Sequence, residues 1–471
     1  MLQAVTSRYL AMVIGFITSM VLARVLLPKE IGLYSVAAAV LAVAHVLRDF
    51  GVTSYLIREP DLTQSKVNTC FTVSLCIAWV FGVIVLSSAQ SIANVYNEPQ
   101  LAPMLTILSV TLFVVPFNSV RYALLRRDQH ARILFIAELG SAFANASVAT
   151  TLAVIGIGPE SLAWGILASI VATGVIVQFG RGTFRVGRPT LADARSVVGF
   201  GGKALGLNLI SRLNAIAPGL ITGKLLGMHD AAILSRADST ADIFGRVAAQ
   251  SIGQVVYAET ARQFREGGAL GASYTKSVVY LSALAMPCYG FVILLALPIV
   301  RILFGPNWDE SASVLRMLGV AGMAAPFILF LGNFLTAIGR IDIQLRIEAI
   351  STPLKICVWL AAAPAGLMVA VNLGVLVHLL AALASTFLIS RLLEVRVVTL
   401  TRAWLHGLLV TGITLSVPTV AVLLEADKHF GELVTVGACV VAAVICWLAA
   451  LFWTAHPFRH ELVLLARSIR Q

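Results

Sequence analysis

Long apolar stretches recur along almost the whole chain, from Tyr9 to Ala455, and short polar segments separate them. A membrane-spanning helix requires about 20 predominantly apolar residues. The pattern therefore predicts an all-α integral membrane protein with about fourteen transmembrane helices, because each stretch approaches that length. The expected spans are 8–27, 31–48, 69–93, 101–121, 133–155, 160–180, 200–224, 231–256, 277–303, 313–338, 343–363, 367–391, 403–424 and 433–455.

The composition leaves no room for a large soluble domain. The chain has 471 residues, of which 59% are hydrophobic and only 12% are charged. Soluble domains carry about 25% charged residues. The six cysteines all lie in apolar stretches and form no CxxC pair, so we expect them to pack and to hold neither a metal nor a disulfide. No cofactor is expected.

The formal net charge of +11 is explained by membrane topology and requires no nucleic-acid partner. Inner-membrane proteins concentrate Lys and Arg in their cytoplasmic segments. If both termini lie in the cytoplasm of a bacterium, most basic residues fall on that side of the expected spans. The opposite side then holds only Lys29, Lys224, Arg301, Arg316 and Lys428. We therefore expect a multi-pass protein of the bacterial inner membrane with both termini inside, in contact with membrane lipids.

The two halves of the chain resemble each other. A shift of 200 residues places Arg24 on Lys224, and a shift of 210 places Glu138 on Glu348. Each repeat would hold six helices, and this even number predicts lobes related by an axis along the membrane normal. The expected organisation is an N-terminal lobe, a basic cytoplasmic linker, a C-terminal lobe, and two extra helices with a basic tail. The corresponding ranges are 1–180, 181–199, 200–396 and 397–471.

Several short segments occur in an order and spacing typical of one family. They are Leu22–Tyr34 (LARVLLPKEIGLY), Asp49–Val52 (DFGV), Tyr96–Pro99 (YNEP) and Leu303–Trp308 (LFGPNW). Together they resemble the Wzx-type polysaccharide flippases, which belong to the multidrug/oligosaccharidyl-lipid/polysaccharide exporter superfamily. One departure concerns the eighth span, where Leu234-Ser235-Arg236-Ala237 replaces the usual Tyr-Ser-Arg-Ala run.

The resemblance implies a fold and an activity. The fold is two six-helix lobes around a central cavity. The activity is alternating-access transfer of an undecaprenyl-diphosphate-linked oligosaccharide from the cytoplasmic to the periplasmic leaflet, for O-antigen, capsule or exopolysaccharide synthesis. Some members couple this transfer to an ion gradient. A glycan polymerase and a chain-length regulator are candidate partners.

Charged and polar residues inside spans are the candidate substrate contacts. Such residues cost at least about 2.5–3.5 kcal/mol at a helix centre, so they persist where they face a wet cavity or a partner. Guanidinium groups bind phosphate oxygens bidentately. The candidates for contact with diphosphate or glycan are Arg24, Asn208, Arg212, Arg236, Arg246 and Gln250. For Arg24 the alternative is that its side chain extends to the outer membrane interface. For the polar residues that recur along the eighth span, the alternative is that they form a buried series of ion pairs.

Four carboxylates inside spans are candidates for ion coupling. Asp238 and Asp242 lie four residues apart, on one face of the eighth span. Glu138 and Glu348 occupy matching places in the repeat. A buried carboxylate can carry a coupling proton when burial favours its neutral form. The alternative for both glutamates is a structural salt bridge to loop arginines such as Arg132 or Arg346.

Other classes of protein are less consistent with the sequence. The chain contains no Gly-rich phosphate loop, HExxH or GxSxG motif, so we expect no enzyme. A membrane glycan polymerase or ligase has similar hydropathy, but it typically carries a large periplasmic loop that this chain lacks. A drug or cation exporter and a peptidoglycan-precursor flippase share the expected fold and remain alternatives.

Overall fold

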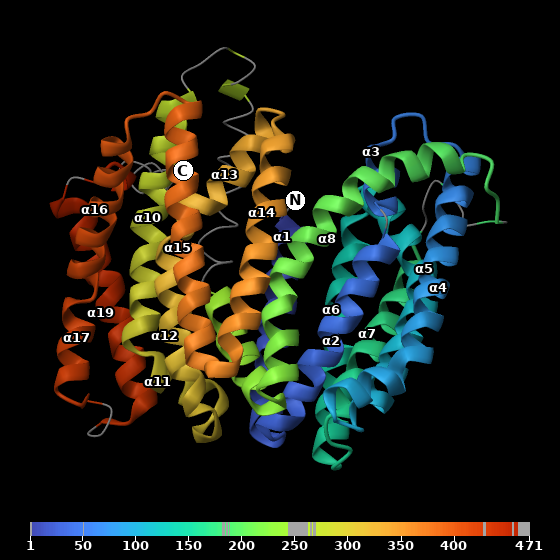
Figure 1. Cartoon of the computed structure of the whole chain (residues 1–471), viewed down its shortest axis with the longest axis horizontal. Helices are drawn as coiled ribbons and strands as arrows, with labels where there is room; N and C mark the ends of the chain where they lie inside the picture. Colours follow the sequence, from blue (N-terminus) through green and yellow to red (C-terminus); the bar gives the residue numbers. More distant parts are fainter. Residues whose placement is uncertain are drawn as a thin grey trace. The chain divides into compact units, whose positions relative to one another are not determined.

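The computed structural model consists of helices joined by turns and loops in the residues that it describes, with no strand among them (Figure 1). These residues are 2–49, 51–180, 184, 187, 189–243, 262–263, 266, 270–426, 430–454 and 456–459. Within them, ten helices are long and apolar enough to cross a membrane. The all-helical membrane fold is thereby confirmed, whereas the number of fourteen spans stays a prediction. The chain divides into two compact units, Met1–Ala232 and Ile233–Gln471.

The first unit consists of long helices joined by short turns, with one short helix between the second and third spans. Its helices are α1 (Leu2–Val25), α2 (Pro28–Asp49), α3 (Val52–Arg58), α4 (Gln64–Tyr96), α5 (Leu101–Arg127), α6 (Ala131–Val154), α7 (Glu160–Gln178) and α8 (Ala194–Leu225). Within this unit α8 packs against α2 and α4. It begins inside the segment expected to be a linker, and the expected lobe boundaries stay a prediction.

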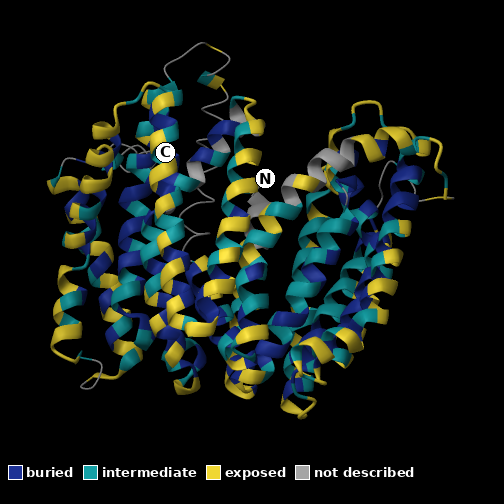
Figure 2. Cartoon of the chain, viewed as in Figure 1, coloured by how far each residue is buried: buried dark blue, intermediate teal, exposed yellow. Residues whose placement is uncertain are grey.

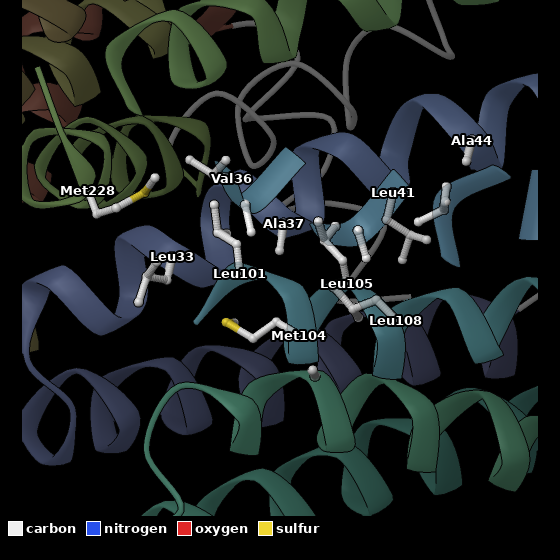
Figure 3. Close-up of a cluster of buried hydrophobic side chains, with 14 of the residues drawn as sticks. Leu33, Val36, Ala37, Leu41, Ala44, Leu101, Met104, Leu105, Leu108 and Met228 are labelled. Carbon is white, nitrogen blue, oxygen red and sulfur yellow. The ribbon is translucent and has the colours of Figure 1, made fainter. Parts of the chain in front are cut away.

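The core of the first unit lies between α2 and α5 (Figure 3). Leu33, Leu41, Leu105 and Leu108 are almost completely buried there, and Leu41 lies close to Leu105 and Leu108. The approach is closest near Gly32, where an added Cβ would lie 1.7 Å from the carbonyl oxygen of Met228. Glycine at this position therefore lets two backbones touch, which fixes the position of α2.

The α4–α5 turn is tied to α8 by the YNEP segment. Asn97 takes the left-handed conformation (φ 56°) that ends α4. The Tyr96 hydroxyl donates to the carbonyl of Leu220 at 3.2 Å, and the Lys224 ammonium donates to the carbonyl of Val95. Glu98 forms a 2.8 Å ion pair with Lys29 in the first turn of α2. The segment therefore joins the α4–α5 turn to α8 and to the start of α2.

At the opposite ends of the same helices, basic side chains cap helix C-termini. Arg127 donates to the carbonyls of Leu56 (2.8 Å) and Glu59 (2.5 Å), at the end of α3. Arg121 donates to the carbonyls of Gly180 (2.5 Å) and Phe184 (3.2 Å), after α7. The last carbonyls of a helix have no intrahelical donor, and a cation near them is favourable. Some basic residues on the expected cytoplasmic side thus also stabilise the fold.

The second unit contains more broken helices than the first. Residues 228–243 are helical, and the second unit begins within this helix, at Ile233. The helices that follow are α10 (Leu270–Leu294), α11 (Ala296–Phe304), α12 (Asp309–Met323), α13 (Ala325–Ala337), α14 (Ile341–Ala362), α15 (Leu367–Leu392), α16 (Val397–Thr414), α17 (Ser416–Leu423) and α19 (Glu432–Trp453), with short 3₁₀ turns η1 (Pro306–Trp308) and η2 (Ala363–Ala365). Three expected single spans, 277–303, 313–338 and 403–424, are each two helices in the structure.

Proline explains these three breaks. Pro298, Pro326 and Pro418 each lie at the second or third position of the helix that begins after a break. Proline lacks the N–H that would bond the preceding turn, and its ring displaces the carbonyl four residues earlier. In membrane helices neighbouring segments satisfy the freed groups.

Two contacts hold the C-terminal helices within the second unit. Arg301 on α11 donates to both oxygens of Asp309, at 2.8 and 2.6 Å, and to Glu432 at the start of α19 at 3.2 Å. At the other end of α19, Trp447 donates through Nε1 to the carbonyl of Ala283 on α10 at 2.7 Å. Its ring also lies beside that of Phe458. Both ends of α19 are therefore fixed to the second unit.

Many large apolar residues are exposed on the helices of both units, and Figure 2 shows exposed positions along the helices. On α4 they include Val80 and Val83, each 56% exposed, and on α19 they include Ile445 at 62%. Apolar surface of this extent indicates contact with lipid in a chain of this composition. The protein is therefore a multi-pass membrane protein.

Candidate functional site

A pocket of about 610 Å³ opens in the first unit, between α2 and α8. One face of α2 lines it with Tyr34, Ala38, His45 and Asp49, which recur at helical spacing. Across from them α8 contributes Ser211, Arg212 and Ala215. The apolar floor is formed by Leu108 of α5 and Ile166 of α7. The pocket thus combines an apolar base with a few convergent polar groups, as ligand sites do.

The pocket lining carries one cationic side chain, Arg212, and one acidic side chain, Asp49. Arg212 is exposed in it and interacts electrostatically with His45. Arg48, one turn beyond His45, is 8% exposed, and its Nε and Nη1 have no hydrogen-bond partner in the described part of the chain. The acid in the lining, Asp49, accepts a 2.8 Å hydrogen bond from Thr53. Arg212 is therefore the charged donor that this lining offers to an anion, and Arg48 lies outside the lining.

The structure confirms the mid-helix position expected for Arg212, since α8 extends well beyond this residue in both directions. If the expected span 200–224 crosses the membrane, a side chain at this position would not easily reach either interface. Asn208 lies one turn earlier on α8, but its side chain is outside the described residues. Its role as a substrate contact stays a prediction.

A second charged cluster lies in the second unit. Asp238 and Asp242, both exposed, lie one turn apart on the helix 228–243. Asp238 interacts electrostatically with Asp242 and with Lys355 of α14. His378 of α15 is near enough to interact with Lys355 in turn. Two carboxylates, an ammonium and an imidazole on three helices form a network that can bind a cation or exchange a proton.

Arg236 lies in a different environment from the two aspartates that follow it. It is 9% exposed, and its guanidinium lies 5.3 Å from the ring centre of Phe304 and 5.4 Å from that of Trp308. Both aromatic residues belong to the LFGPNW segment, and Trp308 is completely buried. A cation over two aromatic faces is attracted by their quadrupoles. Arg236 therefore fixes the helix that carries Asp238.

The remaining candidates are dispersed over the two units. Glu138 on α6 accepts a 3.2 Å hydrogen bond from the hydroxyl of Tyr122, and Glu348 on α14 accepts one of 3.3 Å from Gln344. Arg24 is exposed in the last turn of α1. Arg246 and Gln250 lie outside the described residues.

His45, His378 and Arg48 are not among the candidate residues that the sequence analysis names. The structure places His45 in the pocket with Arg212, and His378 beside Lys355. One signal was available, because His45, Arg48 and Asp49 lie three and four residues apart and must share a helical face. The partners from α8 and α14 are distant in sequence, so no local pattern could identify them.

The fold and these two sites define a polytopic helical membrane transporter. A family model described as "Polysaccharide biosynthesis protein" matches residues 21–313, and the chain belongs to this family. The resemblance to polysaccharide flippases noted in the sequence is thereby confirmed.

Two curated relatives agree with this assignment. The chain is 23% identical to the lipopolysaccharide biosynthesis protein WzxC of Escherichia coli (strain K12), over 72% of this chain and 69% of WzxC. It is 24% identical to the succinoglycan biosynthesis transport protein ExoT of Rhizobium meliloti (strain 1021), over 69% of this chain and 66% of ExoT. Their names refer to polysaccharide biosynthesis and, for ExoT, to transport, which agrees with the expectation of a transporter and not an enzyme.

Solved structures show the same fold at low sequence identity. The lipid II flippase MurJ in an inward closed conformation matches 98% of this chain and 100% of its own, with a TM-score of 0.79 and 11% identity. An inward-facing multidrug resistance MATE transporter of the MOP superfamily matches 85% of this chain and 99% of its own, with a TM-score of 0.66 and 16% identity. The chain therefore has the fold shared by these exporters.

Proposed function

We propose that the protein is a flippase that moves an undecaprenyl-diphosphate-linked oligosaccharide from the cytoplasmic to the periplasmic leaflet by alternating access. The observation that carries the proposal is the pocket of the first unit, where Arg212 and His45 face each other from two helices. A diphosphate crossing the membrane must exchange its water for donors and positive charge. Family membership supplies the sugar cargo, because the matched relatives serve polysaccharide synthesis.

The two units would bind different ligands, because their charged residues differ. In the first unit Arg212 lines the pocket, so this pocket would hold the diphosphate through its guanidinium. Arg24, Arg246, Asn208 and Gln250 would be further contacts to phosphate or sugar. Arg236 would act indirectly, since it is buried between two aromatic rings.

The coupling ion would bind in the second unit. Asp238 and Asp242 offer carboxylates, and Lys355 can neutralise one of them when no cation is bound. A proton or a monovalent cation would compete with the ammonium of Lys355 for Asp238, which couples ion entry to movement of α14. Glu138 and Glu348 remain secondary candidates, because each already accepts a hydrogen bond.

The proposed location is the bacterial inner membrane with both termini in the cytoplasm. The excess of basic residues on one side of the expected spans supports this orientation. A glycan polymerase and a chain-length regulator would act on the product after it reaches the periplasmic leaflet, so both are proposed as partners. Membrane lipids surround the exposed apolar faces.

Transport in a deletion strain tests the function. A strain lacking its own polysaccharide flippase accumulates labelled lipid-linked sugar in the cytoplasmic leaflet. The protein should clear that pool and restore surface polysaccharide, provided that the strain makes the matching glycan. Parallel arms should measure ethidium efflux and rescue of a strain depleted of its peptidoglycan-precursor flippase. Activity only in one of these arms would contradict the proposal in favour of a drug exporter or a lipid II flippase.

A further inference from the structure

A second pocket, distant in sequence from the proposed substrate pocket, lies at one end of three spanning helices in the second unit. Its volume is about 870 Å³. It is bounded by the start of α10, the α15–α16 turn and Pro457 of the C-terminal segment. Because α10, α15 and α16 are all candidate spans, a pocket at their ends lies at a membrane–water interface.

The walls of this pocket are apolar and closely packed. Leu270 and Val279 of α10 face Leu393 and Val395 of the α15–α16 turn. At Gly271 an added Cβ would lie 2.6 Å from a methyl carbon of Val395, so the two segments approach as closely as their backbones allow. The pocket is therefore defined by packed elements on two sides.

Two cations lie in the lining. Lys276 and Arg396 are both exposed, and the ammonium of Lys276 lies 5.2 Å from the ring centre of Tyr280. The hydroxyls of Thr275 and Thr399 add hydrogen-bonding groups. Glu394 is the acid in the lining, so the two cations and this carboxylate together give the lining a net positive charge.

The combination indicates an amphipathic anion. Basic pockets between transmembrane helices bind the head groups of anionic lipids. Free phosphate would need the cations and hydroxyls, but it would leave the apolar walls without a partner. The same apolar surface continues outside the pocket, where Val397 and Val398 at the start of α16 are 42% and 58% exposed. A bound lipid could place its phosphate between Lys276 and Arg396 and its acyl chains along these valines.

We infer that this pocket holds the phosphate of an anionic diacyl phospholipid, with Lys276 and Arg396 as the head-group contacts. The bound lipid would join α10 to the α15–α16 turn. It would thereby stabilise the attachment of the two C-terminal helices, independently of the exported substrate.

The test measures lipid retention by the purified full chain, using native mass spectrometry with phosphatidylglycerol or phosphatidylcholine at equal concentrations. Wild-type protein should retain phosphatidylglycerol preferentially. Lys276→Gln with Arg396→Gln should weaken this retention by about 25-fold, since each cation near an anionic lipid contributes about fivefold. Lys276→Arg with Arg396→Lys should retain it, and Glu394→Gln should strengthen it.

A matched control separates this pocket from general surface charge. Arg391 is also exposed near the end of α15, and its guanidinium lies 4.5 Å from the ring centre of Phe387 and outside the pocket lining. Arg391→Gln should leave retention unchanged. Equal losses in Arg391→Gln and in the double variant would overturn the proposal.

Two competitors identify the ligand. Inorganic phosphate at millimolar concentration should not displace the phospholipid, and displacement would indicate a free-phosphate site instead. Undecaprenyl diphosphate should not displace it at an equimolar ratio, and displacement would make the pocket an entry site for the substrate. Unchanged phosphatidylglycerol retention by a folded double variant, as judged by its elution and circular dichroism, would also overturn the proposal.

Discussion

The guanidinium of Arg236 lies 5.4 Å from the ring centre of Trp308, and the two side chains are buried together in the second unit. Phe304 covers the same guanidinium at 5.3 Å. This contact explains why an arginine in an apolar helix is tolerated only two residues before Asp238. It also gives the LFGPNW segment a structural purpose, because its tryptophan positions the helix that carries the proposed ion site.

Arg236→Ala should destabilise the protein. A desolvated cation–π contact contributes about 2 kcal/mol, and removal of the side chain also leaves a cavity beside Trp308. We expect a lower melting temperature in detergent and a lower level in the membrane. Arg316 on α12 is exposed, so Arg316→Ala is the matched control and should change neither quantity. Equal melting temperatures for Arg236→Ala and wild type would show that the contact contributes nothing.

Tyr96→Phe should loosen the contact of α8 with the α4–α5 turn. The variant loses one hydrogen bond to the carbonyl of Leu220, which contributes about 1 kcal/mol and leaves that carbonyl without this donor. A small decrease in melting temperature is expected, together with faster hydrogen exchange near the C-terminal end of α8. Tyr9→Phe removes a hydroxyl from an exposed position and should have no effect. Unchanged exchange in Tyr96→Phe would refute this assignment.

Mild acid should destabilise the packing of the C-terminal segment through His456. Burial, and secondarily the nearby His406, lower the pKa of His456 from 6.5 to about 4. Between about pH 6.5 and 4 the unfolded state therefore binds a proton that the native state does not bind. Stability should fall as the pH falls through this interval.

The measurement is the melting temperature at pH 7 and at pH 5, for wild type and His456→Gln. The difference between the two pH values should be smaller in the variant. His130→Gln, at the α5–α6 turn, is the control and should behave as wild type. An undiminished pH effect in His456→Gln would assign the acid sensitivity to other groups.

Cysteine labelling in intact cells should establish the orientation. In a variant without the six native cysteines, single cysteines replacing Gln100 and Ile157 should react with an impermeant reagent from the periplasm. Cysteines replacing Gln129 and Glu394 should react only after the cells are opened. All four positions are exposed. Labelling of the second pair in intact cells would reverse the topology.

The sequence was sufficient for the class of fold but not for the geometry of the sites. Apolar stretches of spanning length follow directly from the cost of unpaired backbone groups in lipid, so the helical membrane fold was predictable. The depth of Arg212 followed from its place within a long apolar stretch. The breaks near Pro298, Pro326 and Pro418 were less predictable, since Pro287 and Pro353 lie inside helices that continue.

Side-chain partners were the part that the sequence could not supply. The contact of Arg236 with Trp308, and that of Lys355 with Asp238, join helices far apart along the chain. Periodicity identifies which residues share a face, but not the neighbour opposite that face. His45 illustrates this limit, because a single histidine on an apolar helix gives no indication that an arginine of α8 lies across a pocket from it.

Translocation by Arg212 variants in proteoliposomes tests the central claim most directly. The assay measures the inner-to-outer transfer of undecaprenyl-diphosphate-linked oligosaccharide, with protein amount and folding checked in each preparation. Arg212→Lys should retain part of the wild-type rate, because a point charge binds phosphate less well than a planar guanidinium. Arg212→Ala should abolish transfer while the protein remains in the membrane. A wild-type rate from correctly inserted Arg212→Ala would contradict the account and make this arginine structural.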